Sequence, residues 1–470
     1  MSATEPNSAL SVVILAAGAG TRMKSELPKP LHPVGGRPML AQVLAVAHAI
    51  EPRDITIVGS YELAHHLETA SWAEGAAIAI QDPPRGTADA VRIALESGAS
   101  GSTALVLYAD HPLVTDDVLT DLIAAFDPAA HRLAVMTCTV DDAAGYGRID
   151  RDEAGRIRSI VEKVDDDPAL RTGSTEINSG FMALDRAWAA EALRNLPPNA
   201  RKNEFFLTDL VAMASAENAE SVTSVGGADH VLIGINDRIE LAVADAHLRA
   251  RKRRQLMRDG VTLLSPRSNL IDLDVEVGQD TTIGPGCVLE SATRIGACCR
   301  IGPHTVIRAS TIGDRVRIES STIEHSTIGA DSDVGPYSHL RGGTDIGVGV
   351  HIGNFAELKN ATVSEGTRIG HFSYIGDASL GTKVNIGAGT ITCNFDGTDK
   401  HRTDIGDGAF IGSDTLLVAP VHVGAGARTG AGAVVNRDVA EGATVVGMPA
   451  RQIRRNAPES TIPGEKGADE

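Results

Sequence analysis

The sequence contains few aromatic residues and few cysteines. Only 3% of its 470 residues are Phe, Trp or Tyr, whereas 49 are Gly. This imbalance indicates a tightly turned architecture built from small and aliphatic side chains. The cysteines show no CxxC pair and no metal-ligand spacing with histidine; they are Cys138, Cys287, Cys298, Cys299 and Cys393. An odd number of scattered cysteines is typical of a reducing compartment, where thiols act as small hydrophobic groups.

Long hydrophobic runs are absent as well. The first residues, MSATEPNSALSVVILAAGAG, lack the basic start of a secretory signal, and Gly18 and Gly20 soon interrupt their apolar stretch. No later run is long enough to span a bilayer. We therefore expect a cytoplasmic protein that does not insert into membranes.

Positive charge is scarce. The chain has 43 basic and 61 acidic residues, which give a formal net charge of −18. A field of that sign disfavours binding to nucleic acid and to anionic membranes. Any phosphate-bearing substrate must therefore be bound by local cations against an unfavourable overall field.

The first half of the chain alternates short apolar runs with longer mixed segments. Continuous apolar runs suit buried strands, and the spacing between them leaves room for crossover helices. The pattern predicts an α/β domain over residues 1–236 with a largely parallel sheet. The candidate strands are Val12–Leu15, Ile55–Val58, Ala77–Gln81, Ala104–Ala109 and Leu133–Val140.

Residues 237–261 are predicted to link two domains, mostly as one helix that ends near Arg258. The second half of this helix, Arg249–Arg258, is densely basic. Such a run is either a solvated helix face or a nucleic-acid surface, and the overall acidity favours the solvated face.

After Val261 an aliphatic residue recurs at every sixth position and is often followed by Gly. Examples are Val334, Leu340, Ile346, Ile352 and Leu358. Hexapeptide repeats of this kind predict a left-handed parallel β-helix over residues 262–455, in which each short strand points one apolar residue inward. The segment CNFDGTDKHRT, residues 393–403, interrupts the register and is expected to protrude as a loop. Residues 456–470 are expected to be a disordered tail.

The segment LAAGAGTRM, residues 15–23, follows the first candidate strand. Small residues let a phosphate approach the backbone amides of such a turn closely. Met23 stands where a dinucleotide-binding GxGxxG motif needs Gly, and a P-loop would need GK[ST]. A purely structural turn is the other interpretation. Arg22 and Lys29 belong to the same entry segment, which favours phosphate binding.

The segment LYADHPL, residues 107–113, places Asp110 at the C-terminal end of a buried strand. Open α/β sheets bind ligands at that edge, and a carboxylate there suits Mg²⁺. The other interpretation is that Asp110 caps the next helix. Gln81 and the segment RGTADA, residues 85–90, precede it.

The repeat arithmetic predicts a second site. If each coil has three sides of six residues, Leu340 and Leu358 stack, and Arg341 and Lys359 lie one strand spacing apart, roughly 4.8 Å. Two cations that close repel each other unless an anion lies between them, so we expect a phosphate site. A lone histidine is more often a surface residue, but His371 has polar neighbours on adjacent coils. These neighbours are Tyr374, Asn385, Asn394 and Lys400.

These motifs resemble those of a bacterial enzyme family, the bifunctional N-acetylglucosamine-1-phosphate uridylyltransferase and glucosamine-1-phosphate N-acetyltransferase. LAAGxGTRM, the lysine of LPKPL, QxxxxGTA, LYxDxPL, GYGRI, INSG and GINDR occur in the order of the family. The resemblance covers the whole ordered chain. It implies a Rossmann-like nucleotidyltransferase domain that uses UTP and Mg²⁺, followed by an acetyl-CoA-dependent acetyltransferase domain. It also implies a homotrimer with acetyltransferase sites between subunits.

In the N-terminal domain, the resemblance implies residues for each part of the substrates. Uridine contacts fall to Leu15, Ala17, Gly18, Gln81, Gly86 and Thr87. Arg22 and Lys29 would bind the pyrophosphate, with Lys29 also next to the nucleotide, and Asp110 and Asn236 would ligate Mg²⁺. Gly147, Glu162, Asn178 and Asn236 would bind N-acetylglucosamine-1-phosphate. Attack on the α-phosphorus needs alignment and charge neutralisation and no protein nucleophile.

In the C-terminal domain, the resemblance implies that His371 is the general base for the amine of glucosamine-1-phosphate and that Glu357 orients it. The sugar phosphate would be bound by Arg341, Lys359, Tyr374, Asn385 and Lys400. Acetyl-CoA would be contacted by Ala388, Asn394, Phe395, Ser413 and Ala431.

Three positions depart from the family pattern. Ala19 replaces a frequent lysine, Ala109 replaces the usual Gly before the metal aspartate, and Phe395 replaces the Tyr of NYDG. Two other functions stay open: a nucleotidyltransferase whose β-helix is only an oligomerisation platform, and a non-catalytic scaffold. A scaffold would not need the paired cations, His371 or Asp110, and a platform would not need the acetyltransferase residues.

Overall fold

The computed structural model describes residues 7–18, 20–141, 143, 145–165, 175–227 and 234–455. It divides into two compact units, Met1–Leu248 and Arg249–Glu470, and the division falls inside helix α8 (Arg238–Arg258). The tail that we expected to be disordered, residues 456–470, lies outside the described residues. No described helix combines the length and the apolar character that a membrane crossing requires.

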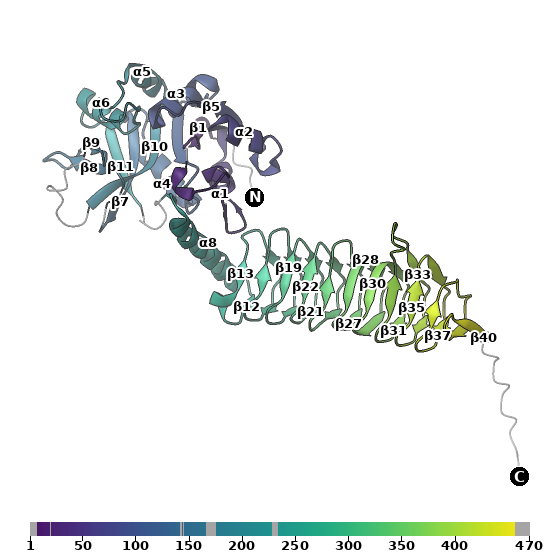
Figure 1. Cartoon of the computed structure of the whole chain (residues 1–470). Coiled ribbons are helices and arrows are strands. Elements are labelled where there is room, and N and C mark those ends of the chain that lie inside the picture. The colour runs from purple at the N-terminus through teal and green to yellow at the C-terminus, as the bar shows by residue number, and fades with distance from the viewer. Residues whose placement is uncertain are drawn as a thin grey trace, which may run out of the picture. The chain divides into compact units, whose positions relative to one another are not determined.

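The N-terminal unit is built around one mostly parallel sheet (Figure 1). The strand order is β11–β7–β10–β6–β1–β4–β5, and along this path only β10 runs antiparallel to its neighbours. The predicted α/β fold is therefore confirmed. The strands are β1 (Asn7–Leu15), β4 (Pro52–Gly59), β5 (Ala77–Ile80), β6 (Thr103–Tyr108), β7 (Leu133–Val140), β10 (Thr175–Asp185) and β11 (Val222–Gly226). The hairpin of β8 (Arg148–Arg151) and β9 (Ile157–Val161) pairs with β10.

Helices cover both faces of this sheet, which explains why its strands are continuously apolar. Val12 and Ile14 of β1 pack in one core with α1 (Met39–Ala49), α2 (Tyr61–Leu67) and α4 (Asp116–Ala125). Val13 and Leu15 pack in a second core with α3 (Thr87–Ser97), α5 (Arg186–Asn195) and α6 (Asp209–Glu217). Successive side chains of a strand point to opposite faces, so both sets are buried.

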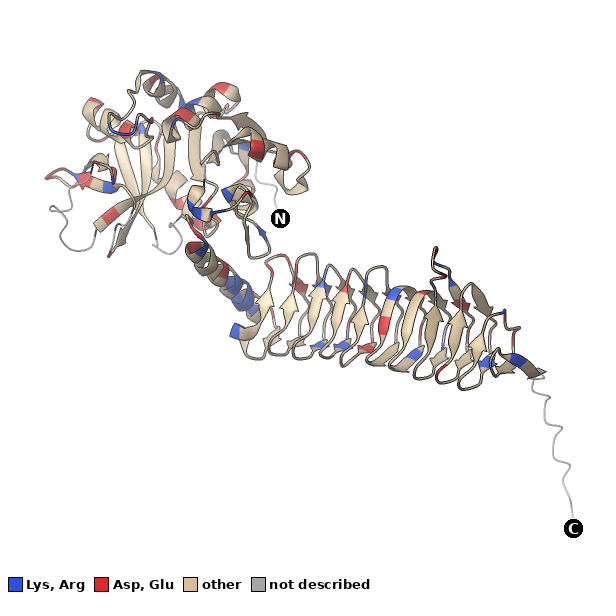
Figure 2. Cartoon of the chain, in the orientation of Figure 1, with Lys and Arg blue, Asp and Glu red and all other residues tan. Residues whose placement is uncertain are grey.

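The basic run of α8 is partly engaged by the first coil of the second unit. Figure 2 shows Lys and Arg gathered on the second half of this helix. Arg249 Nη1 donates a hydrogen bond to Asp272 Oδ1 at 2.7 Å, and Arg253 Nη1 donates to the Asn269 carbonyl at 3.1 Å. The basic run is therefore less solvated than the sequence suggested, because two of its guanidinium groups form hydrogen bonds with the first coil of the β-helix.

The second unit is a parallel β-helix with three-sided coils, which confirms the predicted architecture (Figure 1). One side is a 12-stranded sheet. The other two sides share a 17-stranded sheet, in which β13 (Leu270–Ile271) pairs with β16 (Val288–Leu289) and β14 (Glu276–Val277) pairs with β17 (Arg294–Ile295). The inward side chains form one apolar column from Leu256 to Val445.

Coil length varies along this column. Leu340 pairs with Leu358, so the predicted 18-residue coil is correct there. Ile352 pairs with Ile369, and Ile307 pairs with Ile323, so other coils are shorter than three sides of six. Shortened turns keep the inward residue in register while they change which outward side chains become neighbours. As expected, the chain leaves the coil between β32 (Ile391–Cys393) and β33 (Thr403–Ile405) to form a loop.

Candidate active sites

The first site lies at the carboxyl edge of the N-terminal sheet. Near this edge Leu15 of β1 pairs with Val58 of β4 and with Tyr108 of β6. Asp110 follows β6, the Gly-rich turn follows β1, and Gln81 follows β5. Because these strands are parallel neighbours, the residues expected to bind uridine, pyrophosphate and metal gather at one edge.

Asp110 and Asn236 share one cation, Lys29. The Asp110 carbonyl accepts a hydrogen bond from Ile235 N at 2.8 Å, which brings Asn236 beside it. Lys29 Nζ forms an ion pair with Asp110 and donates to Asn236 Oδ1 at 3.3 Å. Arg22 Nη2 donates to the same amide oxygen at 2.8 Å. The four side chains therefore form one polar cluster.

His111, which the sequence analysis did not single out, helps to keep Asp110 ionised. Its Nδ1 lies 2.8 Å from Asp110 Oδ1, and its ring packs against Tyr108 and Phe181. Burial opposes the ionised carboxylate, but His111 and Lys29 outweigh it and hold the pKa of Asp110 well below its usual range. The only indication in the sequence that His111 belongs to the site was its position next to Asp110 in LYADHPL.

The oxygen pair of Asp110 and Asn236 fits a divalent cation. Both oxygens already converge on the ammonium group of Lys29. Mg²⁺ in proteins commonly has one or two side-chain oxygen ligands and completes its shell with water and substrate phosphates. Within the described part of the chain, no three His, Cys, Asp or Glu side chains cluster as a metal cage, and this metal does not need one.

The Gly-rich turn leaves open space beside β1. Ala17 is partly exposed and Gly18 is exposed, and a Cβ on Gly18 would have no atom within 4 Å. Gly20 differs, because a Cβ there would lie 2.6 Å from Lys29 Cβ. Glycine at this position lets Lys29 approach the turn. Ala109 is buried and its N donates to the Leu15 carbonyl at 3.0 Å, so the extra methyl group is accommodated; Ala19 lies outside the described residues.

Gln81 and Gly86 are joined at the start of α3. Gln81 Nε2 donates to the Gly86 carbonyl at 3.0 Å and to Asp89 Oδ2 at 2.9 Å. Gly86 has a φ of 113°, and a Cβ there would lie 2.3 Å from the Phe205 carbonyl oxygen. Thr87 Oγ1 accepts a hydrogen bond from the backbone of residue 207 at 2.9 Å. The residues expected to bind uridine are thus held rigidly.

The residues expected to bind the sugar phosphate also converge. Asn178 N donates to the Gly147 carbonyl at 2.9 Å. A Cβ on Gly147 would lie 3.3 Å from Glu162 Oε1, which accepts a hydrogen bond from Thr208 Oγ1 at 2.8 Å. Burial, with help from Asp209, raises the pKa of Glu162. Thr208 is a further residue that the sequence analysis missed.

Tyr108 lies close to residues of both predicted sets, Thr87 of the uridine-binding set and Glu162 of the sugar-phosphate-binding set. Its ring packs on Gly180, where a Cβ would lie 2.8 Å from the ring. Burial, then the charges of Glu162 and Asp110, raise its pKa, while a hydrogen bond with Thr87 acts in the opposite direction. Tyr108 therefore stays protonated and can donate a hydrogen bond. The sequence motif LYxDxPL includes Tyr108, but the sequence alone did not indicate a role for this residue.

The second site is a row of cations on the β-helix. Arg341 directly follows β25 (His339–Leu340), and Lys359 lies in the paired strand β28 (Glu357–Val363). Arg341 N donates to the Leu358 carbonyl at 2.8 Å. The two side chains are therefore neighbours, as the repeat arithmetic required. Lys400, and to a lesser degree Arg341, lowers the pKa of Lys359 because the like charges lie close together.

Tyr374 lies in the same row. It begins β30 (Tyr374–Leu380) and pairs with Glu357, while Lys359 pairs with Gly376. A Cβ on Gly376 would overlap the Tyr374 hydroxyl, so the phenol ring lies over the glycine beside Lys359. The structure thus brings Tyr374 to the cation row.

The loop that carries Lys400 is anchored by Asp377. Asn394 Nδ2 donates to Asp377 Oδ2, and Asn360 Nδ2 donates to Asp377 Oδ1 at 2.6 Å. Burial opposes the ionised form of Asp377, but these amides and the two lysines outweigh it and lower its pKa. Phe395, at the tip side of the loop, is 60% exposed. Asp377 had no assigned role in the sequence analysis.

His371 begins a column along one corner of the solenoid. Backbone hydrogen bonds join the corners of successive coils: Gly389 N to the Phe372 carbonyl at 2.8 Å, Asp414 N to the Ala388 carbonyl at 2.7 Å, and Gly432 N to the Ser413 carbonyl at 2.8 Å. The base candidate and the residues expected to contact acetyl-CoA, Ala388, Ser413 and Ala431, therefore follow one another along the same corner.

Two expected neighbours lie elsewhere. Glu357 Oε1 accepts a hydrogen bond from Arg341 Nη1 at 2.8 Å, and the side chain that contacts His371 Nδ1 is Asn354, with Oδ1 at 3.3 Å. The expected pairing of Glu357 with His371 is not observed among the described residues. Asn385 begins β31 (Asn385–Ile386) in the 12-stranded sheet, whereas Lys359 and Tyr374 belong to the 17-stranded sheet. His371 ends β29 (Arg368–His371) of the 12-stranded sheet and lies at the corner, three positions before Tyr374 begins β30.

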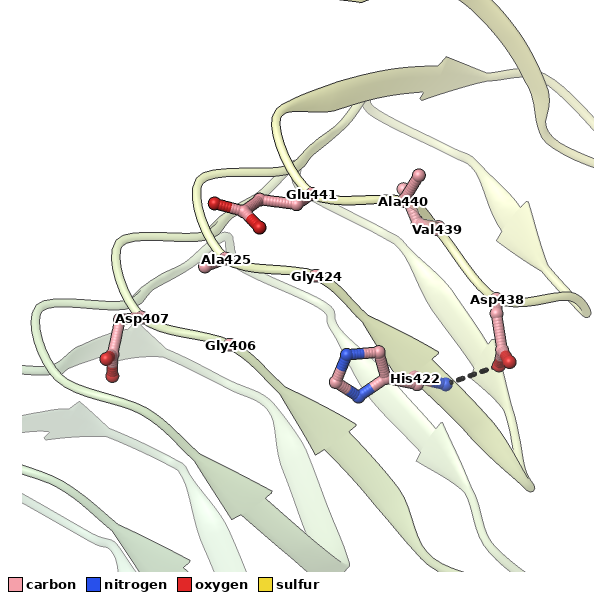
Figure 3. A pocket seen from close by; sticks show the side chains of 9 residues that line it. All are labelled: Gly406, Asp407, His422, Gly424, Ala425, Asp438, Val439, Ala440 and Glu441. Atoms are coloured by element: carbon pink, nitrogen blue, oxygen red, sulfur yellow. Dashed lines mark hydrogen bonds between the residues drawn. The ribbon is translucent and has the colours of Figure 1, made fainter.

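A separate hollow of about 610 Å³ lies near the end of the β-helix (Figure 3). Asp407, His422, Asp438 and Glu441 are among its lining residues. Asp438 Oδ1 accepts a hydrogen bond from His422 N at 2.8 Å, and Asp407 Oδ1 accepts one from the backbone of residue 382 at 2.6 Å. These carboxylates serve local turns, and the lining includes no predicted site residue.

Comparison with known proteins defines the class. A nucleotidyl transferase family model matches residues 11–227, and a model of the GMPPB C-terminal domain matches residues 270–347. With the polar cluster at the sheet edge and the cation row on the solenoid, these matches define a transferase with a nucleotidyltransferase domain and a hexapeptide-repeat domain.

Relatives over the whole length identify the family. Bifunctional protein GlmU of Alkalilimnicola ehrlichii is 42% identical over 97% of both chains. The protein of that name from Heliobacterium modesticaldum is 42% identical over 95% of this chain and 97% of its own, and that of Mycobacterium sp. strain KMS is 40% identical over 95% and 90%. The chain belongs to the family of bifunctional GlmU proteins, as the resemblance implied. It is a bifunctional uridylyltransferase and acetyltransferase that acts on small-molecule substrates.

A solved structure, HddC from Yersinia pseudotuberculosis, matches half of this chain and 97% of its own at 22% identity and a TM-score of 0.38. This likeness is too weak to inform function.

Proposed function

We propose that the N-terminal site transfers the uridylyl group of UTP to N-acetylglucosamine-1-phosphate, and that the C-terminal site first makes that sugar by acetylating glucosamine-1-phosphate. The observation that supports the first half most strongly is the convergence of Arg22, Lys29, Asp110 and Asn236 at the carboxyl edge of the sheet.

In uridylyl transfer, a phosphate oxygen of the sugar attacks the α-phosphorus, and the bond between this phosphorus and the pyrophosphate oxygen breaks. Negative charge therefore moves onto the leaving pyrophosphate. Arg22 and Lys29 bind this charge from positions that the sheet edge has already fixed, so little reorganisation is needed. Asp110 and Asn236 would hold Mg²⁺, which neutralises phosphate charge when bound.

The two ends of the substrate pair are bound by different residues. Leu15, Ala17, Gly18, Gln81, Gly86 and Thr87 contact the uridine, and Gly147, Glu162, Asn178 and Asn236 contact the sugar phosphate. Tyr108 is close to Thr87 and Glu162 and offers its protonated hydroxyl as a hydrogen-bond donor to the substrates. Rigid binding of both ends aligns the attacking oxygen with the α-phosphorus.

In acetyl transfer, the amine nitrogen of glucosamine-1-phosphate bonds to the thioester carbon of acetyl-CoA, and the carbon–sulfur bond breaks to release the thiol. His371 takes the proton that the amine loses. In the tautomer with hydrogen on Nδ1, His371 donates to Asn354 Oδ1 at 3.3 Å and leaves Nε2 as the base. Arg341, Lys359, Tyr374 and Lys400 bind the sugar phosphate, and Glu357 positions the guanidinium group of Arg341 through a hydrogen bond at 2.8 Å.

The coenzyme follows the corner column of Ala388, Ser413 and Ala431 towards His371, with Asn394 and Phe395 of the loop beside it. The 12-stranded sheet carries Asn385, so one chain does not present Asn385 and the cation row on the same side. A homotrimer resolves this separation, because Asn385 of one copy would complete the sugar-phosphate site of another. We also propose a cytoplasmic location, where both co-substrates are made.

An assay of the wild-type chain tests the proposal. Glucosamine-1-phosphate, acetyl-CoA, UTP and Mg²⁺ should yield free thiol and pyrophosphate, and EDTA should stop only the pyrophosphate. Failure to release thiol would contradict the acetyltransferase half. Pyrophosphate release that persists in EDTA would contradict the metal role.

Mixed trimers of two inactive variants test whether the subunits share their acetyltransferase sites. Asn385→Ala and Lys359→Ala should each be inactive in acetyl transfer, and co-refolded mixtures should regain part of the activity because some sites receive both wild-type residues. A monomer by light scattering, or no recovery in mixed trimers, would contradict shared sites.

A further inference from the structure

A buried carboxylate, Asp89, lies in the first turn of α3 and has no part in the chemistry described above. It is 5% exposed. Oδ1 accepts hydrogen bonds from Arg92 Nη2 at 2.6 Å and from Arg85 Nη2 at 3.0 Å. Oδ2 accepts one from Gln81 Nε2 at 2.9 Å and a longer one from Arg85 Nε at 3.4 Å. Burial opposes the ionised form, but these donors outweigh it and lower the pKa of Asp89. Asp89 is therefore a charged acceptor at neutral pH.

Asp89 and the Gly86 carbonyl decide which way the Gln81 amide faces. Both are acceptors, and both lie within 3.0 Å of Nε2. The reversed amide would place Oε1 against a carboxylate and a carbonyl, which is strongly unfavourable in a buried setting. Both N–H bonds of Gln81 are thus used inside the protein. Oε1 receives no hydrogen bond from the residues that the structure describes.

We propose that Asp89 is a positioning residue that sets base selectivity, because it makes Gln81 present only a hydrogen-bond acceptor to the base. The inference rests on the proposed contact between Gln81 and the uridine. Uracil carries a donor, N3–H, whereas N3 of cytosine is an acceptor. A fixed acceptor pairs with the first base and meets a lone pair on the second, so the site selects nucleotides with an imide N–H.

A purely structural role for Asp89 makes a different prediction. If Asp89 only ties α3 to β5, its loss lowers the use of UTP and CTP by the same factor. If it orients Gln81, the ratio between the two nucleotides changes. UTP and CTP differ only in the base, so a change in the ratio of their kcat/KM values between wild type and variant reports altered recognition of the base.

The decisive variant is Asp89→Asn in the full-length chain, with N-acetylglucosamine-1-phosphate as acceptor. Arg92 Nη2 and Arg85 Nη2, at 2.6 and 3.0 Å, keep the Oδ1 acceptor of the new amide, and they outweigh the longer contact of Arg85 Nε with the other position at 3.4 Å. The new Nδ2 therefore faces Gln81 and favours the reversed Gln81 amide. We expect the UTP-to-CTP ratio to fall at least about tenfold, the effect of one charge-assisted hydrogen bond. Glu96→Gln is the matched control, because Glu96 also pairs with Arg92, at 2.8 Å, and lies on the exposed side of it. Its ratio should match that of the wild type.

Each outcome is informative. An unchanged ratio in Asp89→Asn, or equal use of UTP and CTP by the wild type, overturns the inference. A wild type that does not use UTP at all overturns the proposed function instead. If Asp89→Asn loses the folded N-terminal unit, Gln81→Met decides, because it removes Oε1 and leaves Asp89 with both arginines; retained discrimination there overturns the inference as well.

Discussion

Lys29 and Asp110, which are 81 positions apart in the chain, form a close ion pair at the carboxyl edge of the N-terminal sheet. The Lys29 side chain is 12% exposed and that of Asp110 is 22% exposed, so solvent screens the pair only partly. Lys29 Nζ also donates a hydrogen bond to Asn236 Oδ1 at 3.3 Å. Lys29 and Asp110 are thus already held in place at the edge where uridylyl transfer is proposed.

Removal of either partner should stop uridylyl transfer alone. In Asp110→Asn or Lys29→Met, we expect pyrophosphate release to fall by about 10²–10³-fold, the usual effect of losing a preorganised charge. Thiol release by the same chain should stay within about twofold of the wild type. The exposed helix residue Asp117, changed to Asn, is a control that should alter neither rate. Equal loss of both activities would show that the variant disturbs the whole chain.

As pH rises, the acetyltransferase site should begin to lose affinity for glucosamine-1-phosphate at a lower pH than it would if Lys359 had the pKa of an ordinary lysine. The folded pKa of Lys359 lies below the ordinary value because of Lys400 and Arg341, so Lys359 becomes neutral earlier as pH rises and binds phosphate less well. The measurement is KM for glucosamine-1-phosphate against pH. In Lys400→Met the pKa of Lys359 should rise, and the alkaline increase in KM should move to higher pH. A profile that does not move in this variant would contradict the coupling of the two lysines.

Loosening the anchor of the loop should weaken substrate binding. Asp377→Asn replaces one acceptor by a donor, so Asn394 or Asn360 loses its hydrogen bond and Lys400 loses a counter-charge. We expect kcat/KM for acetyl transfer to fall about tenfold, which corresponds to about 1.4 kcal/mol. Asp404→Asn, next to Arg402 in the same region, should leave it unchanged. Wild-type kinetics in Asp377→Asn would mean that the loop is held by other contacts.

The inward column should carry the stability of the β-helix. Leu358 is fully buried, and Leu358→Ala should lower the free energy of unfolding by about 2–5 kcal/mol through lost burial and a cavity. Thr362→Ala, at an exposed position of the same strand, should cost far less. The expected result in calorimetry is a lower melting temperature for one transition with uridylyl transfer intact. Equal effects of the two variants would contradict the inward assignment of Leu358.

Much of the fold could be predicted because its signals are local. The observed β7 matches the predicted Leu133–Val140, and α8 begins one residue after the expected Asp237. The hexapeptide period likewise identified the β-helix, since inward residues must recur to fill one column. The antiparallel insertion of β10 between β6 and β7 was not predicted, because an apolar run does not encode the direction of its partners.

The sequence was enough to propose which residues belong to the candidate sites, but it did not predict every side chain that contacts them. The contact of Asn354 with His371 depends on a coil one residue shorter than the ideal repeat. The contact of Glu357 with Arg341 lies in a coil of ideal length and depends on side-chain direction, which the repeat does not encode. The role of Asp89 was hidden in GTADA, since only the fold brings Gln81 beside it. The assignments of substrate atoms to individual residues remain predictions.

The most direct test of two independent sites on one chain is a parallel assay of Asp110→Ala and His371→Ala, in which pyrophosphate from UTP and free thiol from acetyl-CoA are followed together. We expect that Asp110→Ala releases thiol but no pyrophosphate, and that His371→Ala, supplied with N-acetylglucosamine-1-phosphate, releases pyrophosphate but no thiol. Normal thiol release by His371→Ala would contradict this expectation.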